Sequence, residues 1–281
     1  MRRIDETSLI RAWQECFLSK GGWKKTDLKG MARHCWCACD NGVRAYLVSS
    51  CTSTMDIARN LADNGLFPEK SWVAALEQTR GRGRCDRPWD SAGGNLFATV
   101  RLPDRAAAAG PWLAMALGLL ITQGMKNHIP ALEIKWPNDI IVGGKKAGGI
   151  LVEVRQGIIM AGIGLNVETV PGAETHPGGY TIPACSLKAF GCSANAPQIW
   201  RSLVGGFNQN LMDILASPDD LKYRVNQVLA FKGSHVLLEE NGNASRLVKV
   251  LEVDSTARLM VASSGKKEAI TRGRIIPRIT H

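Results

Sequence analysis

The residues best suited to chemistry form a loop in which arginine alternates with glycine. It reads Glu77-Gln-Thr-Arg-Gly-Arg-Gly-Arg84 and follows an apolar, strand-like segment at 72–76. Glycine lets backbone N–H groups approach a ligand, and arginine pairs bidentately with phosphate or carboxylate. The loop lacks the Gly-Lys-Ser/Thr of a P-loop, and Asp86 stands where the dinucleotide fingerprint requires glycine. It therefore predicts an anion site outside the common nucleotide loops.

Three further motifs follow in order along the chain. They are Lys135-Trp-Pro-Asn-Asp139, Lys146-Ala-Gly-Gly-Ile-Leu-Val-Glu153 and Gly162-Ile-Gly-Leu-Asn166. Shorter matches precede them: Ser53-Thr54 after an expected strand, Arg87-Pro-Trp89 after the arginines, and Gly93-Gly-Asn-Leu-Phe97 at the next strand. From about Tyr46 onward, the order and spacing of these motifs resemble those of the biotin protein ligases. One motif alone would be weak evidence, but several in the same order are specific.

The resemblance implies an ATP-dependent, AMP-forming ligase that makes a carbon–nitrogen bond. Such an enzyme converts biotin to biotinyl-5'-adenylate and transfers it to a specific lysine of a biotin carboxyl carrier protein, the carrier domain of a biotin-dependent carboxylase. Adenylation is needed because a carboxylate is a poor acyl donor, and AMP is a better leaving group. The expected substrates are biotin and ATP, which arrives with Mg²⁺, and no tightly bound metal is expected.

The resemblance also implies roles for individual residues. Lys135 would lie between the biotin carboxylate and the α-phosphate while the loop folds over both ligands, so Lys135 and Arg82 are the expected catalytic residues. Biotin contacts are expected from Ser53, Thr54, Met55, Gln78, Arg82, Gly83, Arg84, Lys135, Gly148 and Gly149. ATP contacts are expected from Arg82, Arg84, Trp89, Asn138, Lys146 and Asn166. A metal site is not predicted, although Asp139 is the nearby carboxylate to test.

Several of these side chains also have a structural interpretation. Ser53 and Thr54 could cap a helix, a role compatible with lining a pocket because helix N-termini present free N–H groups. Trp89 could pack in the core. Gln78 could face water at a strand end, although its amide suits the ureido ring of biotin. The glycines after Lys146 could form a tight turn.

The composition is that of a soluble globular protein with anionic partners. The chain has 281 residues, of which 45% are hydrophobic, and a formal net charge of +10. The arginines cluster in one loop rather than along a helix face, so we do not expect DNA to bind. There is no run of eighteen apolar residues, and the first residues lack the apolar core of a signal peptide. We expect a cytoplasmic protein without membrane contact.

The eight cysteines are expected to be thiols in a reducing compartment. Three of them cluster in His34-Cys35-Trp-Cys37-Ala-Cys39, where residues two apart share one face of a strand. Asp40-Asn41-Gly42 then offers a tight hairpin turn before a strand at 43–48. Zinc sites usually pair two Cys-x-x-Cys motifs, so the default expectation here is a hairpin without metal.

The spacing of apolar residues predicts an α+β fold. Helices are expected at 6–20, 55–64, 110–128, 196–214 and 219–229, and strands at 45–48, 72–76, 95–101, 133–136, 139–142, 149–154 and 158–167. They predict a mixed, mostly antiparallel sheet with helices packed on it, as in the biotin/lipoate ligase-like catalytic domain that the resemblance implies. Short strands at 235–239, 247–253, 258–262 and 267–271 predict a small C-terminal β-barrel.

These elements suggest three parts. Residues 1–45 form an N-terminal extension, a helix plus a hairpin, whose role the sequence does not reveal; residues 46–230 form the catalytic domain that binds biotin and ATP; and residues 231–281 form the barrel. Two alternative functions remain open. One is lipoate or octanoate attachment on the related fold, and the other is a biotin-responsive DNA-binding regulator that uses the first 45 residues. A homodimer through exposed strands of the central sheet is possible.

Overall fold

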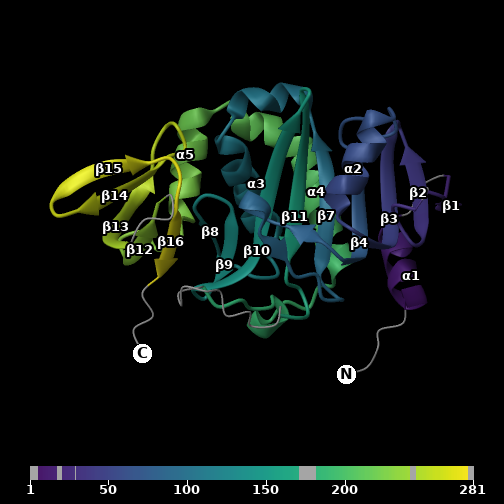
Figure 1. Cartoon of the computed structure of the whole chain (residues 1–281), viewed down its shortest axis with the longest axis horizontal. Helices are drawn as coiled ribbons and strands as arrows, with labels where there is room; N and C mark the ends of the chain where they lie inside the picture. The colour runs from purple at the N-terminus through teal and green to yellow at the C-terminus, as the bar shows by residue number, and fades with distance from the viewer. Residues whose placement is uncertain (1–5, 18–20, 29, 171–181, 241–244, 278–281) are drawn as a thin grey trace.

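The computed structural model describes residues 6–17, 21–28, 30–170, 182–240 and 245–277. Its main body is a nine-stranded sheet in the order β1-β2-β3-β4-β7-β11-β10-β9-β8 (Figure 1). The strands are β1 (Lys24–Thr26), β2 (Cys35–Asp40), β3 (Val43–Cys51), β4 (Trp72–Gln78), β7 (Leu96–Leu102), β8 (Leu132–Lys135), β9 (Asp139–Val142), β10 (Lys145–Arg155) and β11 (Ile158–Leu165). β3 and β4 are parallel and the other neighbouring pairs antiparallel, which confirms the predicted sheet.

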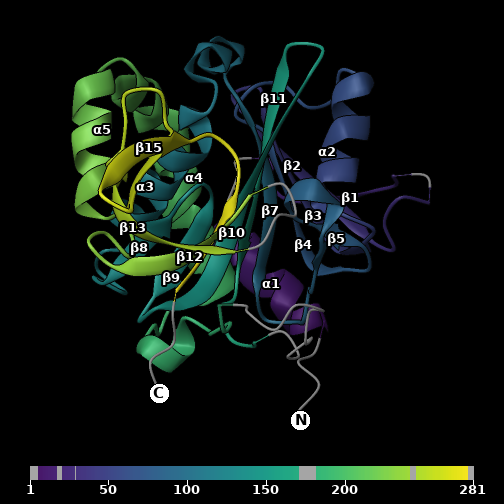
Figure 2. The same ribbon diagram turned by 60° about the vertical axis from the view of Figure 1, so that its left-hand side comes forward.

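Helices cover both faces of this sheet. The α-helices are α1 (Glu6–Cys16), α2 (Thr54–Asp63), α3 (Trp112–Gly124), α4 (Ala196–Leu215) and α5 (Pro218–Gln227). Short 3₁₀ turns are η1 (Arg84–Asp86), η2 (Asp104–Ala109) and η3 (Lys188–Phe190). α3 and α4 pack on one face and α2 on the other, as Figure 2 shows from the side.

The alternation of side chains along a strand divides the interior into two cores. In β4, Trp72 and Ala74 belong to the larger core beneath α3 and α4, whereas Val73 and Ala75 belong to the smaller core beneath α2. Because β4 is buried on both faces, it reads as a continuous apolar run. The cavity described below lies on the α2 side of the sheet, beside the start of that helix.

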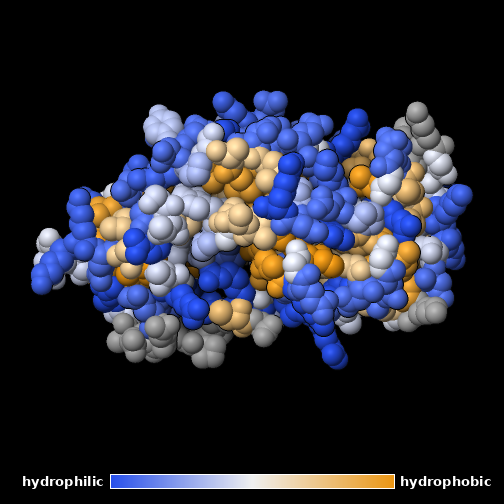
Figure 3. Space-filling view, turned by 90° about the horizontal axis from the view of Figure 1, so that it is seen from above, coloured by the Kyte–Doolittle hydropathy of each residue, from blue (hydrophilic) through white to orange (hydrophobic). Residues whose placement is uncertain are grey.

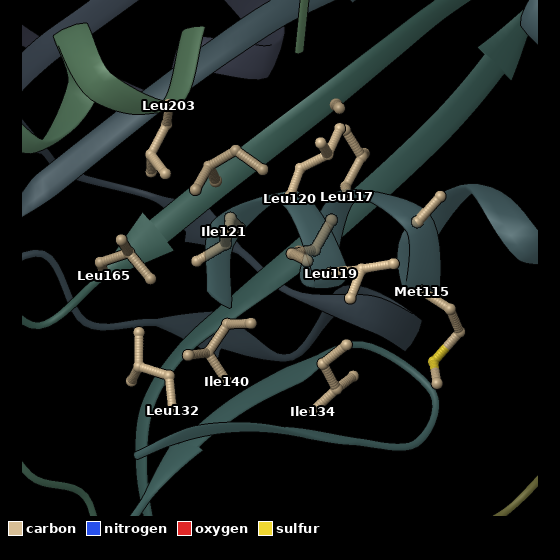
Figure 4. Close-up of a cluster of buried hydrophobic side chains, with 14 of the residues drawn as sticks. Met115, Leu117, Leu119, Leu120, Ile121, Leu132, Ile134, Ile140, Leu165 and Leu203 are labelled. Carbon is tan, nitrogen blue, oxygen red and sulfur yellow. The ribbon is translucent and has the colours of Figure 1, made fainter. Parts of the chain in front are cut away.

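Helix α3 is apolar on nearly all sides because it lies between the sheet and α4. Figure 4 shows Ile121 of α3 on the side of the helix toward Ile140 of β9, with Leu117 and Leu120 on the opposite side. A Cβ atom at Gly118 would lie 3.2 Å from the Ile134 side chain, so glycine allows the helix to approach β8 closely. This packing fixes strand β8, which ends at Lys135.

The N-terminal residues join the main body. Trp13 of α1 is buried, with its ring 6.0 Å from Phe17 and 6.2 Å from Trp72 of β4. The predicted hairpin is confirmed: β2 and β3 are joined through Asn41 and Gly42, whose φ angles of 49° and 80° are the positive values of a tight hairpin turn. The predicted boundary after residue 45 falls inside β3, and the three-part division of the chain stays a prediction.

The C-terminal unit is a small β structure, as predicted, but not a closed barrel. Its strands are β12 (His235–Glu239), β13 (Arg246–Val253), β14 (Leu259–Ser263), β15 (Lys266–Ile270) and β16 (Arg274–Pro277). They form an open sheet in the order β15-β14-β13-β12-β16. The link at 271–273 carries the chain across to β12, so β16 pairs with β12 and does not close the sheet against β15. The barrel prediction was wrong because the alternation shows strands but not closure.

None of the helices in the described part of the chain is long and apolar enough to span a membrane. Hydrophilic residues cover most of the face seen in Figure 3, and hydrophobic residues lie in patches between them.

Candidate active site

A cavity of about 860 Å³ opens on the sheet face that α2 covers only in part. Its walls are the start of α2, the end of β4, the loop at 81–89, and strands β8 to β11. The residues of the sequence prediction that line it are Ser53, Thr54, Met55, Gln78, Arg82, Gly83, Arg84, Trp89, Lys135, Asn138, Asp139, Lys146 and Gly149. Segments far apart in the sequence therefore meet around one space large enough for two small ligands.

One end of the cavity is neutral and rich in hydrogen bonds. Gln78 Oε1 accepts from the backbone N–H and the hydroxyl of Thr54, at 2.8 and 3.2 Å. Gln78 Nε2 donates to Ser91 Oγ at 3.1 Å, and Thr99 Oγ1 donates to Thr54 Oγ1 at 2.9 Å. Ser53 is the N-cap of α2, which confirms the capping interpretation. The parallel pairing of β3 and β4 places the start of α2 next to the end of β4, and thus builds this cluster.

The other end is cationic, with Lys135 buried and Lys146 half-buried. Asp139 holds two lysines, Lys135 Nζ at 2.5 Å and Lys146 Nζ at 2.6 Å. Burial would raise the pKa of the Asp139 carboxyl, but the two ammonium groups outweigh it and hold that pKa below its usual range. Burial also lowers the pKa of Lys135, against the attraction of Asp139. With both lysines protonated, the three groups carry a net charge of +1 inside the cavity.

Glycines make the floor of the cavity flat. Gly149 of β10 and Gly164 of β11 are directly opposite each other, and the Trp89 ring lies against them. A Cβ atom on Gly164 would lie 2.7 Å from that ring, and one on Gly162 would lie 3.1 Å from Met55 Sδ. The Lys146 ammonium lies 5.4 Å from the centre of the Trp89 ring, within cation–π range. A side chain at Gly162 or Gly164 would therefore displace a wall of the site.

The arginine loop closes over this floor. Gly81 and Arg82 form β5, which pairs with β6 (Pro88–Trp89). Arg82 forms a bidentate ion pair with Asp56 of α2, through Nη2–Oδ1 at 2.7 Å and Nη1–Oδ2 at 3.0 Å. Partial burial would raise the pKa of Asp56, but Arg82 keeps it below its usual range. Arg84 is exposed, and its Nη1 donates to Asn138 Oδ1 at 3.4 Å, a long hydrogen bond.

Two predicted residues lie outside the cavity lining. Gly148 sits at a bulge in β10, and a Cβ there would lie 2.4 Å from the Leu165 side chain, so glycine is needed for strand packing. Asn166 is buried just after β11, with its Nδ2 at 3.5 Å from the Lys146 carbonyl. Its Oδ1 has no hydrogen-bond partner among the described residues. Their ligand contacts remain predictions.

Metal binding finds no support in the described residues. Both oxygens of Asp139 are taken by lysines, and the described part of the chain has no group of three or more His, Cys, Asp or Glu side chains arranged to hold a metal ion. Burial raises the pKa of Cys35 to about 12 and also raises that of Cys37, so these thiols stay protonated. The cysteine cluster is part of a hairpin.

Sequence reasoning missed several residues that line the site. Gly162 and Gly164 lie in a motif that was recognised but given no role, and their spacing of two on a strand indicates one open face. The C-terminal unit contributes Arg272, Arg274 and Glu239, with Arg274 and Glu239 paired at 3.9 Å. No local signal marks these three, because only the packing of the two sheets brings them to the cavity.

Known proteins resemble this chain in sequence. Residues 47–169 match the profile of the biotin/lipoate A/B protein ligase family. The biotin–[acetyl-CoA-carboxylase] ligase of Mycobacterium tuberculosis is 30% identical over 213 residues, which cover 73% of this chain and 77% of that protein. The bifunctional ligase/repressor BirA of Bacillus subtilis is 38% identical over 128 residues, which cover 43% of this chain and only 39% of that relative.

The fold agrees with these sequence matches. The solved biotin protein ligase from Aquifex aeolicus, in complex with biotin and ATP, aligns with a TM-score of 0.69 over 82% of this chain and 97% of that one, at 20% identity. Three observations support the same family: the cavity, the motifs that line it, and the match over most of the mycobacterial ligase. The chain belongs to the biotin protein ligases, within the biotin/lipoate A/B protein ligase family.

Proposed function

We propose that this protein activates biotin with ATP to give biotinyl-5'-adenylate and transfers the biotinyl group to a lysine of a biotin carboxyl carrier domain. The observation that carries the proposal is the shape of one cavity, in which a neutral hydrogen-bonding end faces two lysines, Lys135 buried and Lys146 half-buried, that share one carboxylate. Biotin has matching halves, a neutral ureido ring and a carboxylate tail. The sequence match over most of the mycobacterial ligase supports the same assignment.

The neutral end suits the ureido ring. Gln78 and Thr54 together present donors and acceptors at the start of α2, beside the N-cap Ser53. An amide and two hydroxyls can serve both the carbonyl and the N–H groups of a cyclic urea. Met55 adds an apolar contact next to Gly162. Lipoate and octanoate have no ureido group to exchange hydrogen bonds with this end, so it disfavours them.

The cationic end suits the reacting anions. In the first step a carboxylate oxygen attacks the α-phosphorus, and the bond to pyrophosphate breaks. Both reactants are negatively charged, so fixed positive charge between them lowers the barrier. Lys135 and Lys146 are held in place by one shared carboxylate, and their net positive charge is oriented before the substrates arrive.

The remaining contacts concern ATP and the acceptor. Trp89, Asn138 and Arg84 line the same cavity, as do Arg272 and Arg274 from the C-terminal sheet, so adenine and phosphate binding at this end is part of the proposal. Mg²⁺ would be carried largely by phosphate oxygens. In the second step the ε-amine of the acceptor lysine attacks the acyl carbon, AMP leaves, and the amine loses a proton.

The described residues give little support to a DNA-binding function. In the part of residues 1–45 that the structure describes, α1 is followed by strands, with no second helix to enter a major groove. We keep the cytoplasmic location and a homodimer through exposed strands as proposals. The outer edge of the sheet, β1, is three residues long and carries the exposed Lys24 and Lys25, which disfavour pairing at that edge.

The test is exchange of labelled pyrophosphate into ATP, run with biotin, lipoate and octanoate on the wild type and on Lys135→Ala. We expect exchange with biotin alone and a loss of about a hundredfold or more in the variant. Lys126→Ala, at an exposed position, is the matched control. Exchange with lipoate or octanoate but not biotin would refute the biotin assignment, and no exchange with any acid would refute the ligase function.

A further inference from the structure

The arginine loop is a small hairpin whose parts move together. Gly81 pairs with Trp89 and Arg82 with Pro88, and the Gly83 N–H donates to the Arg87 carbonyl at 2.8 Å. The hairpin is joined to the body at its base, where the N–H groups of 79 and 80 donate to the carbonyls of 51 and 52, both at 2.9 Å. Fixing Arg82 therefore also fixes Trp89 across the ribbon.

Arg82 is fixed by one carboxylate of the body. Asp56 accepts both of its Nη groups, and it also accepts from Thr52 Oγ1 at 3.2 Å and from Arg59 Nη1 at 3.2 Å. Arg59 in turn pairs with Glu153 of β10. The side chains of Arg82 and Asp56 are 27% and 24% exposed, so the pair is shielded from much of the solvent.

The charges of this network balance. Two guanidinium groups, Arg59 and Arg82, face two carboxylates, Asp56 and Glu153. The network therefore offers an anionic substrate little net attraction. The Lys135, Lys146 and Asp139 group does the opposite, since two cations share one carboxylate. Positive charge for the reaction thus comes from the lysine end, and the Arg82 pair has a different use.

We propose that Asp56 is a positioning residue of the ligase reaction, which clasps Arg82 and so holds the hairpin and its Trp89 over the cavity. Arg82 then acts through Asp56 and not as a direct ligand of the carboxylate or phosphate. This inference rests on the proposed function for its effect on catalysis. The clasp itself is a property of the ligand-free protein and is tested without ligand.

The first measurement is limited proteolysis of the ligand-free protein by trypsin, following cleavage after the exposed Arg84 by mass spectrometry. The variants are Asp56→Asn, Arg82→Met and the double variant. Since each removes the same ion pair, we expect each to speed cleavage by about tenfold, with no further gain in the double variant. Asp104→Asn removes a carboxylate paired to Arg101 away from the cavity and should cleave at the wild-type rate.

The second measurement is biotin-dependent pyrophosphate exchange in the same variants and in the charge-reversed pair Asp56→Arg with Arg82→Asp. A clasp predicts equal losses in the two single variants, with the KM for ATP rising more than kcat falls, and partial recovery in the reversed pair. Unchanged cleavage in both single variants would overturn the clasp. A much larger loss in Arg82→Met than in Asp56→Asn, without recovery on reversal, would show that Arg82 binds the ligands directly.

Discussion

The two ends of the cavity are both polar and largely shielded from water, but they differ in how their groups are satisfied. At the neutral end, Gln78, Thr54 and Thr99 hydrogen-bond to one another and carry no charge. At the cationic end, Asp139 serves two lysines and leaves an excess of positive charge. A network whose hydrogen bonds are satisfied fixes the geometry of its side chains. A group with an excess of positive charge attracts an anion. The neutral end is suited to selecting a ligand, and the cationic end is suited to stabilising the charges of a reaction.

The largest effect is expected from removing the carboxylate of Asp139, which both lysines share. In Asp139→Asn two lysines lose their shared counter-ion, and one of them, Lys135, is buried. We expect a loss of about 3–5 kcal/mol in the free energy of unfolding. Urea unfolding measures it. Asp220→Asn, which removes an exposed partner of Arg224, should change stability by less than about 1 kcal/mol.

The difference in stability between Asp139→Asn and the wild type should depend on pH, in a direction set by the pKa of Asp139. The pKa of Asp139 is lower in the folded protein than in the unfolded chain, so its stabilisation is complete above the ordinary aspartate pKa of about 4 and is lost as the pH falls below it. The difference in stability between the wild type and Asp139→Asn should therefore shrink below about pH 4. A constant difference from pH 6 to pH 2 would contradict the ion pairs.

A smaller effect is expected at the neutral end from Gln78→Glu. The change keeps the shape but removes the donor to Ser91 and adds a negative charge where the network is neutral. We expect biotin binding, measured by calorimetry without ATP, to weaken by about 10- to 100-fold. ATP binding should be unchanged. If the affinities for biotin and for ATP fell equally, the neutral end would not be specific to biotin.

The floor that joins the ends should respond to Gly164→Ala. The new methyl group would collide with the Trp89 ring at 2.7 Å, so the ring must move. We expect the KM for ATP to rise about tenfold with little change for biotin. Gly205→Ala in α4 is the control, because a Cβ there meets nothing within 4 Å. An unchanged KM for ATP would exclude Trp89 as part of the nucleotide site.

The smallest effect is expected from Thr99→Val, which removes one hydrogen bond deep in the neutral network. Thr99 is fully buried and donates to Thr54, and valine has nearly the same shape. We expect a loss of about 1 kcal/mol in stability, seen as a lower melting temperature. A shift in biotin affinity larger than the loss of stability would show that this bond aligns Thr54 for the ligand.

The sequence predicted what local chemistry can show. The Asn41-Gly42 turn, the Ser53 cap and the sheet with its helices could be inferred because each depends on neighbouring residues or on side-chain periodicity. Lys135 and Gln78 could be placed in one cavity because their motifs resemble a family, which supplies the long-range contact that spacing alone does not.

What could not be predicted depends on distant packing. Nothing near Arg272 or Arg274 indicates a place beside the cavity, since β16 reaches it only by crossing to β12. The same crossing leaves the C-terminal sheet open. The pairing of Asp56 with Arg82 was also missed, because an acidic residue in the first turn of a helix is explained by the helix dipole alone.

The parallel contact of β3 with β4 has a further consequence for the order of folding. It joins the start of α2 to Gln78 across 24 residues, and Thr99 donates to Thr54 across 45 residues. The cationic end is more local, because Lys135 and Asp139 are four residues apart and Lys146 follows at the start of β10. Contacts of high sequence separation form slowly, because a long loop must close first. During refolding, strands β8 to β10 should gain protection from hydrogen exchange before the contact between β3 and β4.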